Sequence, residues 1–285
     1  MLFENVMIVG TGLIGASLGL ALKESQEVNK IIGYDNNIHS LQNALEINSF
    51  DLIGSISDLS KANLIIFATP VETTKKLLLE NLKSINENTV VTDVGSTKEE
   101  IMNLFDSLNG GINFIGGHPL AGSEKSGPLN AKKDLFKNKP YILVRSKNCE
   151  QESFEKFKTL ILKIGATPII LDAKIHDKIL AVTSHLPQIV AFYLMKTLMD
   201  LNETDNTYLN LTGSGFKDTT RLAGSDAKMW IDIFKQNKDN IIESLTIFEK
   251  ELKKFKRKLA SDKYEKIKEE LESIRSFKTR SEGKE

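Results

Sequence analysis

The chain contains very few of the residues from which disulfide-built proteins and structural metal sites are made. Its 285 residues include one cysteine, Cys149, and four histidines that are scattered along the sequence. A single cysteine excludes an internal disulfide and fits a reducing compartment. Scattered histidines without neighbouring cysteines lack the ligand spacing of a zinc site, so we expect no metal.

Net charge is also absent, because 38 basic residues balance 38 acidic ones. A neutral chain has no general attraction to nucleic acid or to anionic membrane, so we expect neither as a partner. Basic residues outnumber acidic ones only in the tail from Glu249 onward. There Phe248, Leu252, Phe255 and Leu259 recur at helical spacing, which favours one face of a packed helix over a nucleic-acid-binding arm.

An uncharged stretch near the N-terminus, from Val6 to Leu22, is nearly as long as a secretory or membrane-spanning segment. No basic cluster precedes it, and glycines interrupt it where a spanning helix would carry leucine or isoleucine. The sequence therefore predicts a cytoplasmic protein.

Hydrophobic residues make up 40% and charged residues 27% of the chain, which is typical of soluble globular proteins, and the length favours two domains. The first two thirds alternate β-branched runs with helical patterns, as α/β proteins with a parallel sheet do. The strand candidates, each suited to burial on both faces, are Val6–Val9, Lys30–Tyr34, Leu64–Ala68, Val90–Asp93, Phe114–Gly116, Tyr141–Val144 and Pro168–Leu171. After Asp172 helical patterns take over, beginning with an apolar stretch from Ile179 to Leu201. We therefore expect domains over residues 1–172 and 173–285, the second all-helical with a charged tail.

A glycine-rich signature follows the first predicted strand and opens a helix. It reads Gly10-Thr11-Gly12-Leu13-Ile14-Gly15. In this context Gly10 permits the tight turn, Gly12 lets a pyrophosphate approach the backbone, and Gly15 allows close packing of helix on strand. The free N–H groups of the helix N-terminus then face the phosphates. The signature predicts a Rossmann-type dinucleotide-binding domain.

Asp35 ends the second predicted strand, where it could accept hydrogen bonds from a ribose 2′-hydroxyl. A carboxylate there would repel a 2′-phosphate, and neither Asn36 nor Asn37 offers a cation to bind one. We therefore predict NAD rather than NADP as cofactor, with Thr69 and Pro70, after a later strand, also beside it.

Candidates for chemistry lie beyond the carboxyl ends of the later strands: Thr69, Ser96, His118, Ser123 and Glu124. His118 stands in a rigid turn between Gly117 and Pro119, and its ordinary pKa near 6.5 suits a general base. His185 lies in the apolar helix two residues before Pro187, which should kink the helix. It is equally a core histidine or a ligand contact. His176 and His39 are expected to cap a helix or face solvent.

A turn at Gly213 leads into a helical segment that carries Lys217, Asp218 and Arg221. The planar guanidinium of Arg221 suits a carboxylate, so it is a candidate substrate anchor, and a surface ion pair with Asp218 or Asp226 is the ordinary alternative. Trp230, the only tryptophan, is expected to lie half in the core and half in a pocket wall.

Several blocks together resemble the prephenate/arogenate dehydrogenases of tyrosine biosynthesis. They are GTGLIGASL (10–18), DVGSTK (93–98), GGHPLAGSEKSG (116–127), TSHLPQ (183–188) and GSGFKDTTRLAGSDAKMW (213–230). The resemblance spans Val6 to about Leu252. It departs from the family pattern at Ser214, where glycine is frequent, and at Ala227, where proline is frequent.

The resemblance implies a Rossmann-type domain followed by a helical domain that forms a homodimer. It implies that NAD(P) takes a hydride from the ring carbon bearing the hydroxyl while the ring carboxylate leaves as carbon dioxide. It implies catalytic roles for His118, which accepts the hydroxyl proton, with Ser96 and His185. Substrate-binding roles fall on Ser123, Glu124, Lys217, Asp218, Arg221 and Trp230. Because the chain leaves no room for a full regulatory domain, any feedback by tyrosine is expected at the active site.

Other functions stay open at this point. Arogenate differs from prephenate by an amino group in place of the keto group, and Glu124 or Asp218 could bind that cation. A β-hydroxyacid or 6-phosphogluconate-type dehydrogenase would need a catalytic lysine in the helical domain, for which Lys217 is the only hint. A sensor that binds NAD without catalysis is the alternative outside enzymes.

Overall fold

The computed structural model describes residues 1–108, 112–122, 125–203, 207–281 and 283. The chain divides into two compact units, residues 1–238 and residues 239–285. The expected domain boundary after residue 172 thus lies inside the first unit, and it stays a prediction. The predicted substrate residues Ser123 and Glu124 lie outside the described residues.

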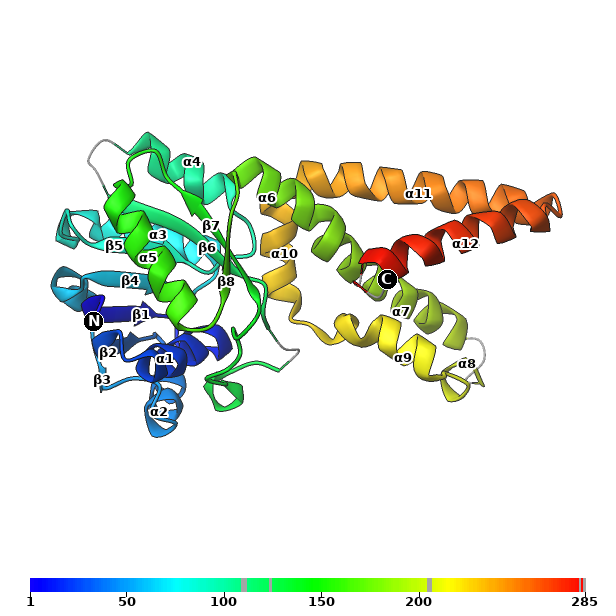
Figure 1. Ribbon diagram of the computed structural model, residues 1–285. Helices are drawn as coiled ribbons and strands as arrows, with labels where there is room; N and C mark the ends of the chain where they lie inside the picture. The colour runs from blue at the N-terminus through cyan, green and yellow to red at the C-terminus, as the bar shows by residue number, and fades with distance from the viewer. Residues whose placement is uncertain (109–111, 123–124, 204–206, 282, 284–285) are drawn as a thin grey trace. The chain divides into compact units, whose positions relative to one another are not determined.

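The first unit is built around one eight-stranded sheet with the order β3-β2-β1-β4-β5-β6-β7-β8 (Figure 1). Its strands are β1 (Phe3–Val9), β2 (Val28–Tyr34), β3 (Leu52–Ile53), β4 (Leu64–Phe67), β5 (Val90–Asp93), β6 (Asn113–Pro119), β7 (Pro140–Arg145) and β8 (Thr167–Ile170). All neighbouring pairs are parallel except β6 and β7, which are antiparallel. The carboxyl ends of β1, β4 and β5 therefore meet at one edge of the sheet, where open α/β folds bind ligands.

The seven predicted strands are all present, and the α/β expectation is confirmed. The two-residue β3 gave no run of apolar residues long enough to recognise. The expectation that every strand is buried on both faces is wrong for β8, in which Ile169 is 39% and Ile170 is 56% exposed. β8 is an edge strand, and an edge position leaves side chains in solvent that a central strand would bury.

Helices cover both faces of the sheet. They are α1 (Leu13–Ser25), α2 (Ile38–Glu46), α3 (Val71–Asn81), α4 (Glu99–Ser107) and α5 (Gln151–Lys163). Residues of α1, α2 and α5 form one apolar core with the sheet, and residues of α3 and α4 form a second core on the opposite face. Burial of both faces accounts for the continuous apolar strands that the sequence shows. Short 3₁₀ helices occur at Ile56–Lys61, Leu82–Ser84 and Pro128–Asn130.

Helices follow β8, as the sequence predicts. Those of the first unit are α6 (Ala173–Leu180), α7 (Leu186–Asn202), α8 (Thr207–Asn210), α9 (Ser214–Thr220), a 3₁₀ turn η5 (Arg221–Gly224) and α10 (Ala227–Gln236). A π-helical turn, η4 (Ala181–His185), joins α6 to α7. Pro187 stands at the start of α7, so the expected irregularity beside His185 takes the form of a π turn.

The second unit consists of α11 (Lys238–Ala260) and α12 (Tyr264–Ser281), which run antiparallel in Figure 1. An ion pair between Lys258 and Glu270 links the two helices at 2.5 Å. The tail is therefore helical, as expected, and it stays helical to Ser281.

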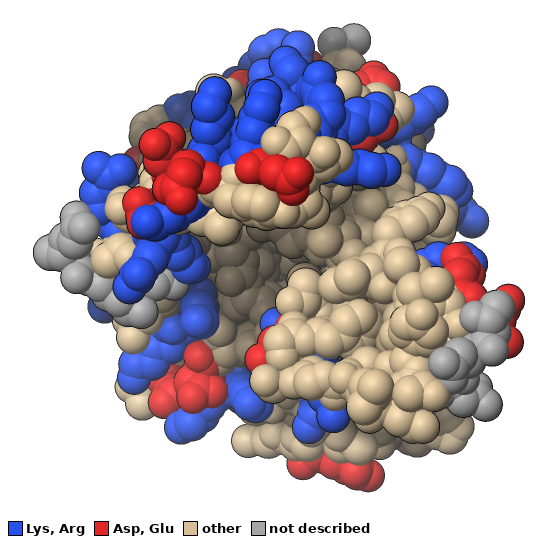
Figure 2. Space-filling view, turned by 90° about the vertical axis from the view of Figure 1, so that its right-hand side faces the viewer, with Lys and Arg blue, Asp and Glu red and all other residues tan. Residues whose placement is uncertain are grey.

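The helical part of the first unit exposes many apolar side chains, among them Tyr193, Met199, Leu201, Tyr208, Leu209 and Leu211. Figure 2 shows that much of the surface in view carries neither acidic nor basic side chains. Within the described residues, the helix over 173–202 is long and apolar enough to cross a membrane by length and composition alone. It also carries His176, Asp177 and His185, all buried, and polar residues buried within the protein are unlike the lipid-facing side chains of a span.

The packing of α1 on the glycine-rich turn gives a stability prediction. A Cβ added at Gly15 would lie 2.0 Å from the Gly10 carbonyl oxygen and 3.1 Å from the Ala68 Cβ. We expect Gly15→Ala to lower the free energy of unfolding by roughly 1–3 kcal/mol, as overpacking does, in urea titrations followed by circular dichroism. The matched control is Gly215→Ala in α9, where a Cβ would meet nothing within 4 Å. Equal stability of the two variants would contradict the prediction.

Candidate active site

A cavity of about 590 Å³ opens at the carboxyl edge of the sheet, within the first unit. A volume in this range suits a small-molecule ligand. Among the residues that line it are the predicted site residues Gly12, Leu13, Ile14, Thr69, Pro70, Ser96 and His118. Helix α10 closes another side through Met229, Asp232, Ile233 and Gln236. The cavity thus joins the glycine-rich turn to the proposed base.

The glycine-rich turn has the features of a phosphate site. Gly10 has φ +99°, and a Cβ there would lie 2.5 Å from the Ala68 carbonyl oxygen, so only glycine fits. Helix α1 begins after Gly12 with no side-chain cap and no acidic residue in its first turn. Its first N–H groups therefore lack a side-chain acceptor and favour an anion. A Cβ at Gly12 would meet nothing within 4 Å, which leaves space for a ligand against the backbone.

Asp35 follows β2, and its carboxylate is fixed by three bonds from the chain. It accepts from the Thr11 backbone N–H at 2.8 Å, from the Thr11 hydroxyl at 3.1 Å and from the Asn37 N–H at 2.9 Å. A carboxylate can accept about four hydrogen bonds, so capacity remains for a ribose hydroxyl. These bonds, together with the two glycines Gly10 and Gly15, hold the turn in shape. The free N–H groups at the start of α1 and the remaining acceptor capacity of Asp35 fit an NAD-type dinucleotide.

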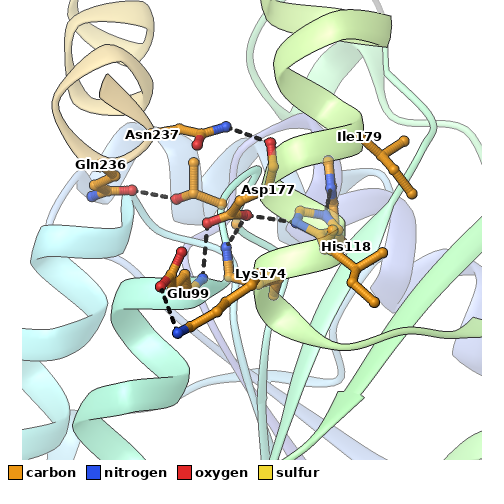
Figure 3. A network of polar contacts seen from close by, with 12 residues as sticks. Glu99, His118, Lys174, Asp177, Ile179, Gln236 and Asn237 are labelled. Atoms are coloured by element: carbon orange, nitrogen blue, oxygen red, sulfur yellow. Dashed lines mark hydrogen bonds and ion pairs between the residues drawn. The ribbon is translucent and has the colours of Figure 1, made fainter. Parts of the chain in front are cut away.

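His118 lies at the end of β6 and forms a chain of buried polar groups with α6 (Figure 3). Its Nδ1 is 2.8 Å from Nε2 of His176, and the Nδ1 of His176 is 2.7 Å from Oδ1 of Asp177. Asp177 also accepts from the backbone N–H groups of Lys98 at 2.8 Å and Glu99 at 2.9 Å. The chain therefore ties the base to the start of α4.

The pattern of contacts assigns the protons in this chain. The Asp177 carboxylate can only accept, so Nδ1 of His176 donates to it and Nε2 of His176 is the acceptor. Nδ1 of His118 then donates to His176. This leaves Nε2 of His118 with a free lone pair, as a general base requires.

Burial lowers the pKa of His118 well below 6.5, and the positive charges that His176, Lys98 and His185 can carry lower it further. The imidazole is therefore neutral at physiological pH. Burial also lowers the pKa of His185 to about 4, against an opposing effect of Asp177. Both histidines thus keep one donor and one acceptor nitrogen.

His185 and Trp230 carry unpaired buried polar atoms. The Asn237 side-chain amide donates to the Asp177 carbonyl at 2.7 Å and lies 3.1 Å from Nδ1 of His185, which accepts. Nε2 of His185 is therefore an N–H donor, and neither it nor Nε1 of Trp230 has a partner among the described residues. The two rings meet edge to face, with centroids 6.0 Å apart. Unpaired buried donors are costly, and a bound acceptor would satisfy them.

The loop that carries Ser96 is held from α10. The Thr97 hydroxyl bonds to Oε1 of Gln236, and the Gln236 amide donates to Glu72 at 3.1 Å. Ser96 and His118 both line the cavity.

Several predicted site residues are not among those that line the cavity, and these include His185 and Trp230. Lys217, Asp218 and Arg221 are exposed on α9 and η5 and are not among the residues that line the cavity. Trp230 is 8% exposed, so it is more buried than the predicted half-and-half position.

Sequence analysis missed His176 and Asp177. The expectation that His176 caps a helix or faces solvent is wrong, because its side chain is fully buried and lies between His118 and Asp177. The available signal was helical spacing: Ala173, His176 and Leu180 follow one another at steps of three and four, the pattern of a buried face. Asp172, the neighbour that suggested capping, does cap α6.

Comparison with known proteins matches two family profiles to consecutive parts of the chain. The family profile described as "Prephenate dehydrogenase, nucleotide-binding domain" matches residues 18–170, and the profile "Prephenate dehydrogenase, dimerization domain" matches residues 172–273. The chain belongs to the prephenate dehydrogenase family. It therefore carries the family's Rossmann-type NAD-binding domain and its helical dimerisation domain, as the resemblance implied.

Individual relatives agree with this family. The chain is 34% identical to prephenate dehydrogenase of Bacillus subtilis over 97% of its own length and 74% of the relative's. Prephenate dehydrogenase from Aquifex aeolicus in complex with hydroxyphenyl propionate and NAD+ superimposes with a TM-score of 0.91, at 32% identity, over 97% of this chain and 98% of that one. Arogenate dehydrogenase of Synechocystis gives a TM-score of 0.82 at 26% identity, over 97% and 99% of the two chains.

The buried chain of polar groups gives a prediction for this family member. We expect His176→Asn to lower kcat by about 10- to 100-fold, because His118 loses the partner that fixes its ring and tautomer. NAD binding, measured by fluorescence titration, should stay unchanged. The matched control is His39→Asn in the exposed first turn of α2. A His176 variant as active as that control would show that His118 needs no orientation.

Proposed function

We propose that this enzyme catalyses the NAD-dependent oxidative decarboxylation of prephenate to 4-hydroxyphenylpyruvate in tyrosine biosynthesis. The observation that carries the proposal is His118, a neutral base of fixed tautomer in the wall of the cavity that the glycine-rich turn also lines. Two of the relatives with 33–34% identity are named prephenate dehydrogenase, which favours prephenate over arogenate.

The chain's own residues account for the proton chemistry. NAD, when bound, supplies the acceptor for a hydride from the ring carbon that bears the hydroxyl. Nε2 of His118 takes the hydroxyl proton, and the Ser96 hydroxyl shares that hydrogen bond. Loss of the ring carboxylate as carbon dioxide leaves its electron pair in the ring, which becomes aromatic. The ring oxygen then regains a proton from His118, which restores the phenol and the neutral base. The base removes a proton that becomes more acidic as the hydride leaves, so a neutral imidazole is sufficient.

Substrate binding is proposed at the unpaired donors. The N–H groups of His185 and Trp230 can donate to a substrate carboxylate, which would satisfy both. We further propose that Ser123, Glu124, Lys217, Asp218 and Arg221 contact the substrate, with Arg221 as a carboxylate anchor. A cytoplasmic homodimer, with tyrosine competing at the active site, completes the proposal.

One experiment tests the function directly. Purified protein is given NAD with prephenate and, in parallel, with arogenate, and NADH formation is followed by absorbance, with NADP as the cofactor control. We expect reduction with prephenate and NAD. Activity with arogenate alone would change the substrate and keep the mechanism. Inactivity with both would overturn the proposal in favour of a sensor that binds NAD without catalysis.

His118→Asn tests the base. Asparagine keeps a hydrogen-bonding side chain of similar size and removes the proton acceptor, so kcat should fall by about 10²- to 10⁴-fold. The dissociation constant for NAD should stay within about twofold of the wild-type value, because His118 does not build the glycine-rich turn. A variant with nearly full turnover would exclude His118 as the base.

The pH profile tests the protonation state. Burial and neighbouring positive charge lower the pKa of His118 below 6.5, so the free-base form predominates above that value. We expect kcat/KM to be level near neutral pH and to fall as the pH drops through the lowered pKa, where a proton occupies Nε2. An acidic limb centred above pH 6.5 would contradict this assignment.

A further inference from the structure

Asp93, at the end of β5, holds the backbone in front of two proposed catalytic residues at once. Its Oδ2 accepts from the Gly95 N–H at 2.8 Å, and its Oδ1 accepts from the Gly117 N–H at 3.2 Å. Gly95 directly precedes Ser96, and Gly117 directly precedes His118. One carboxylate therefore fixes where both catalytic side chains leave the backbone.

Lys98 pairs with this carboxylate in the interior. Its ammonium bonds to Oδ2 of Asp93, and the two side chains are 0% and 1% exposed. Taking two charges out of water costs more than an apolar pair of the same volume would, so stability alone does not explain such a pair. The contacts of the pair with the backbone near Ser96 and His118 suggest a role in positioning these two residues.

The lysine side chain fills the space between the two loops. A Cβ on Gly116 would lie 3.0 Å from Cδ of Lys98, and a Cβ on Gly95 would lie 3.4 Å from its Nζ. Gly116 therefore lets the lysine side chain approach the backbone of β6 directly. The N–H of Lys98 also donates to Asp177, the carboxylate at the end of the His118 and His176 chain. Lys98 is thus linked to His118 by two routes: its side chain reaches it through Asp93 and Gly117, and its backbone through Asp177 and His176.

We propose that Asp93 and Lys98 are positioning residues, a buried ion pair that holds the Ser96 hydroxyl and the His118 imidazole at the separation that catalysis requires. The inference rests on the proposed function, because it assigns Ser96 and His118 to the same proton transfer. Displacement of a reacting group by about 1 Å can cost about 100-fold in rate, which is the scale of the expected effect.

The charges around His118 predict that the Asp93 and Lys98 pair also affects the pKa of His118. The nearby titratable groups are His176 and Asp177 on α6, His185 on η4, and the Asp93 and Lys98 pair. Lys125, Asp226 and Asp232 line the same cavity as His118. The Lys98 ammonium disfavours a second positive charge on His118 and so lowers its pKa. Removal of that ammonium leaves the Asp93 carboxylate uncompensated, and both changes raise the pKa of His118 toward its ordinary value.

The test uses Lys98→Met in the full chain, with Thr89→Val as the matched control. Thr89 is buried just before the other end of β5, and its hydroxyl donates to the Ala62 carbonyl at 2.8 Å, so its loss perturbs the same strand away from the site. We expect kcat of Lys98→Met to fall by about 10- to 100-fold relative to the control. The acidic limb of kcat/KM should move to higher pH, with the dissociation constant for NAD unchanged.

The double variant Asp93→Asn with Lys98→Met covers the case in which a lone buried carboxylate prevents folding. It removes both charges, and its amide has one oxygen to accept from Gly95 and Gly117, where the carboxylate has two. We expect it to fold and to lose kcat by a similar factor. Failure of both variants to fold would assign the pair to stability of the fold and would overturn the proposal.

A readout without turnover separates this inference from the proposed function. The chain has four histidines, so NMR titration of their ring protons, assigned with His118→Asn, gives the pKa of His118 directly. We expect a rise in Lys98→Met and none in Thr89→Val. An inactive wild-type enzyme that shows this rise would refute the function alone. An active wild-type enzyme whose Lys98 variant keeps its kcat, pH limb and histidine titration would refute the positioning role alone.

Discussion

The buried carboxylate of Asp177 is the contact on which the site depends. It accepts two backbone N–H groups at the start of α4 and one imidazole N–H from His176, so it joins the sheet domain to α6. An ionised carboxylate in the interior is tolerated because three donors replace water. Through His176 the same carboxylate decides which nitrogen of His118 is free. The orientation of the base is thus a consequence of how α6 packs on the sheet.

The polar groups of this site are of two kinds: some are hydrogen-bonded within the chain, and others have donors without partners. Asp35 and Asp177 each accept three hydrogen bonds from the chain itself, which hold the turn and the base in place before any ligand binds. His185 and Trp230 instead retain donors without partners. Rigid groups suit positioning, and unsatisfied donors suit recognition, because a ligand that supplies acceptors removes the cost of their burial.

The relatives include both prephenate and arogenate dehydrogenases, so the overall fold does not determine which of the two substrates is bound. Prephenate and arogenate dehydrogenases share this fold with TM-scores of 0.91 and 0.82 to the chain. Since both classes have the same architecture, the difference between a keto and an amino group must be read by a few side chains.

The sequence by itself determined the features that depend on short stretches of chain. The glycine-rich turn, Asp35 and the seven apolar strands each follow from local steric and periodic rules. His118 was recognisable as a histidine near a strand end, but the expected turn there is wrong, because β6 continues through Pro119 and pairs with β7. The tertiary structure alone decided which groups meet. His176 reaches His118 across 58 positions, and Lys98 reaches Asp177 across 79. No spacing rule encodes such pairs, because their distance depends on how separate helices and strands pack. When a polar residue lies on an apolar helix face, the sequence indicates only that its side chain is buried. Which group it contacts depends on the tertiary structure.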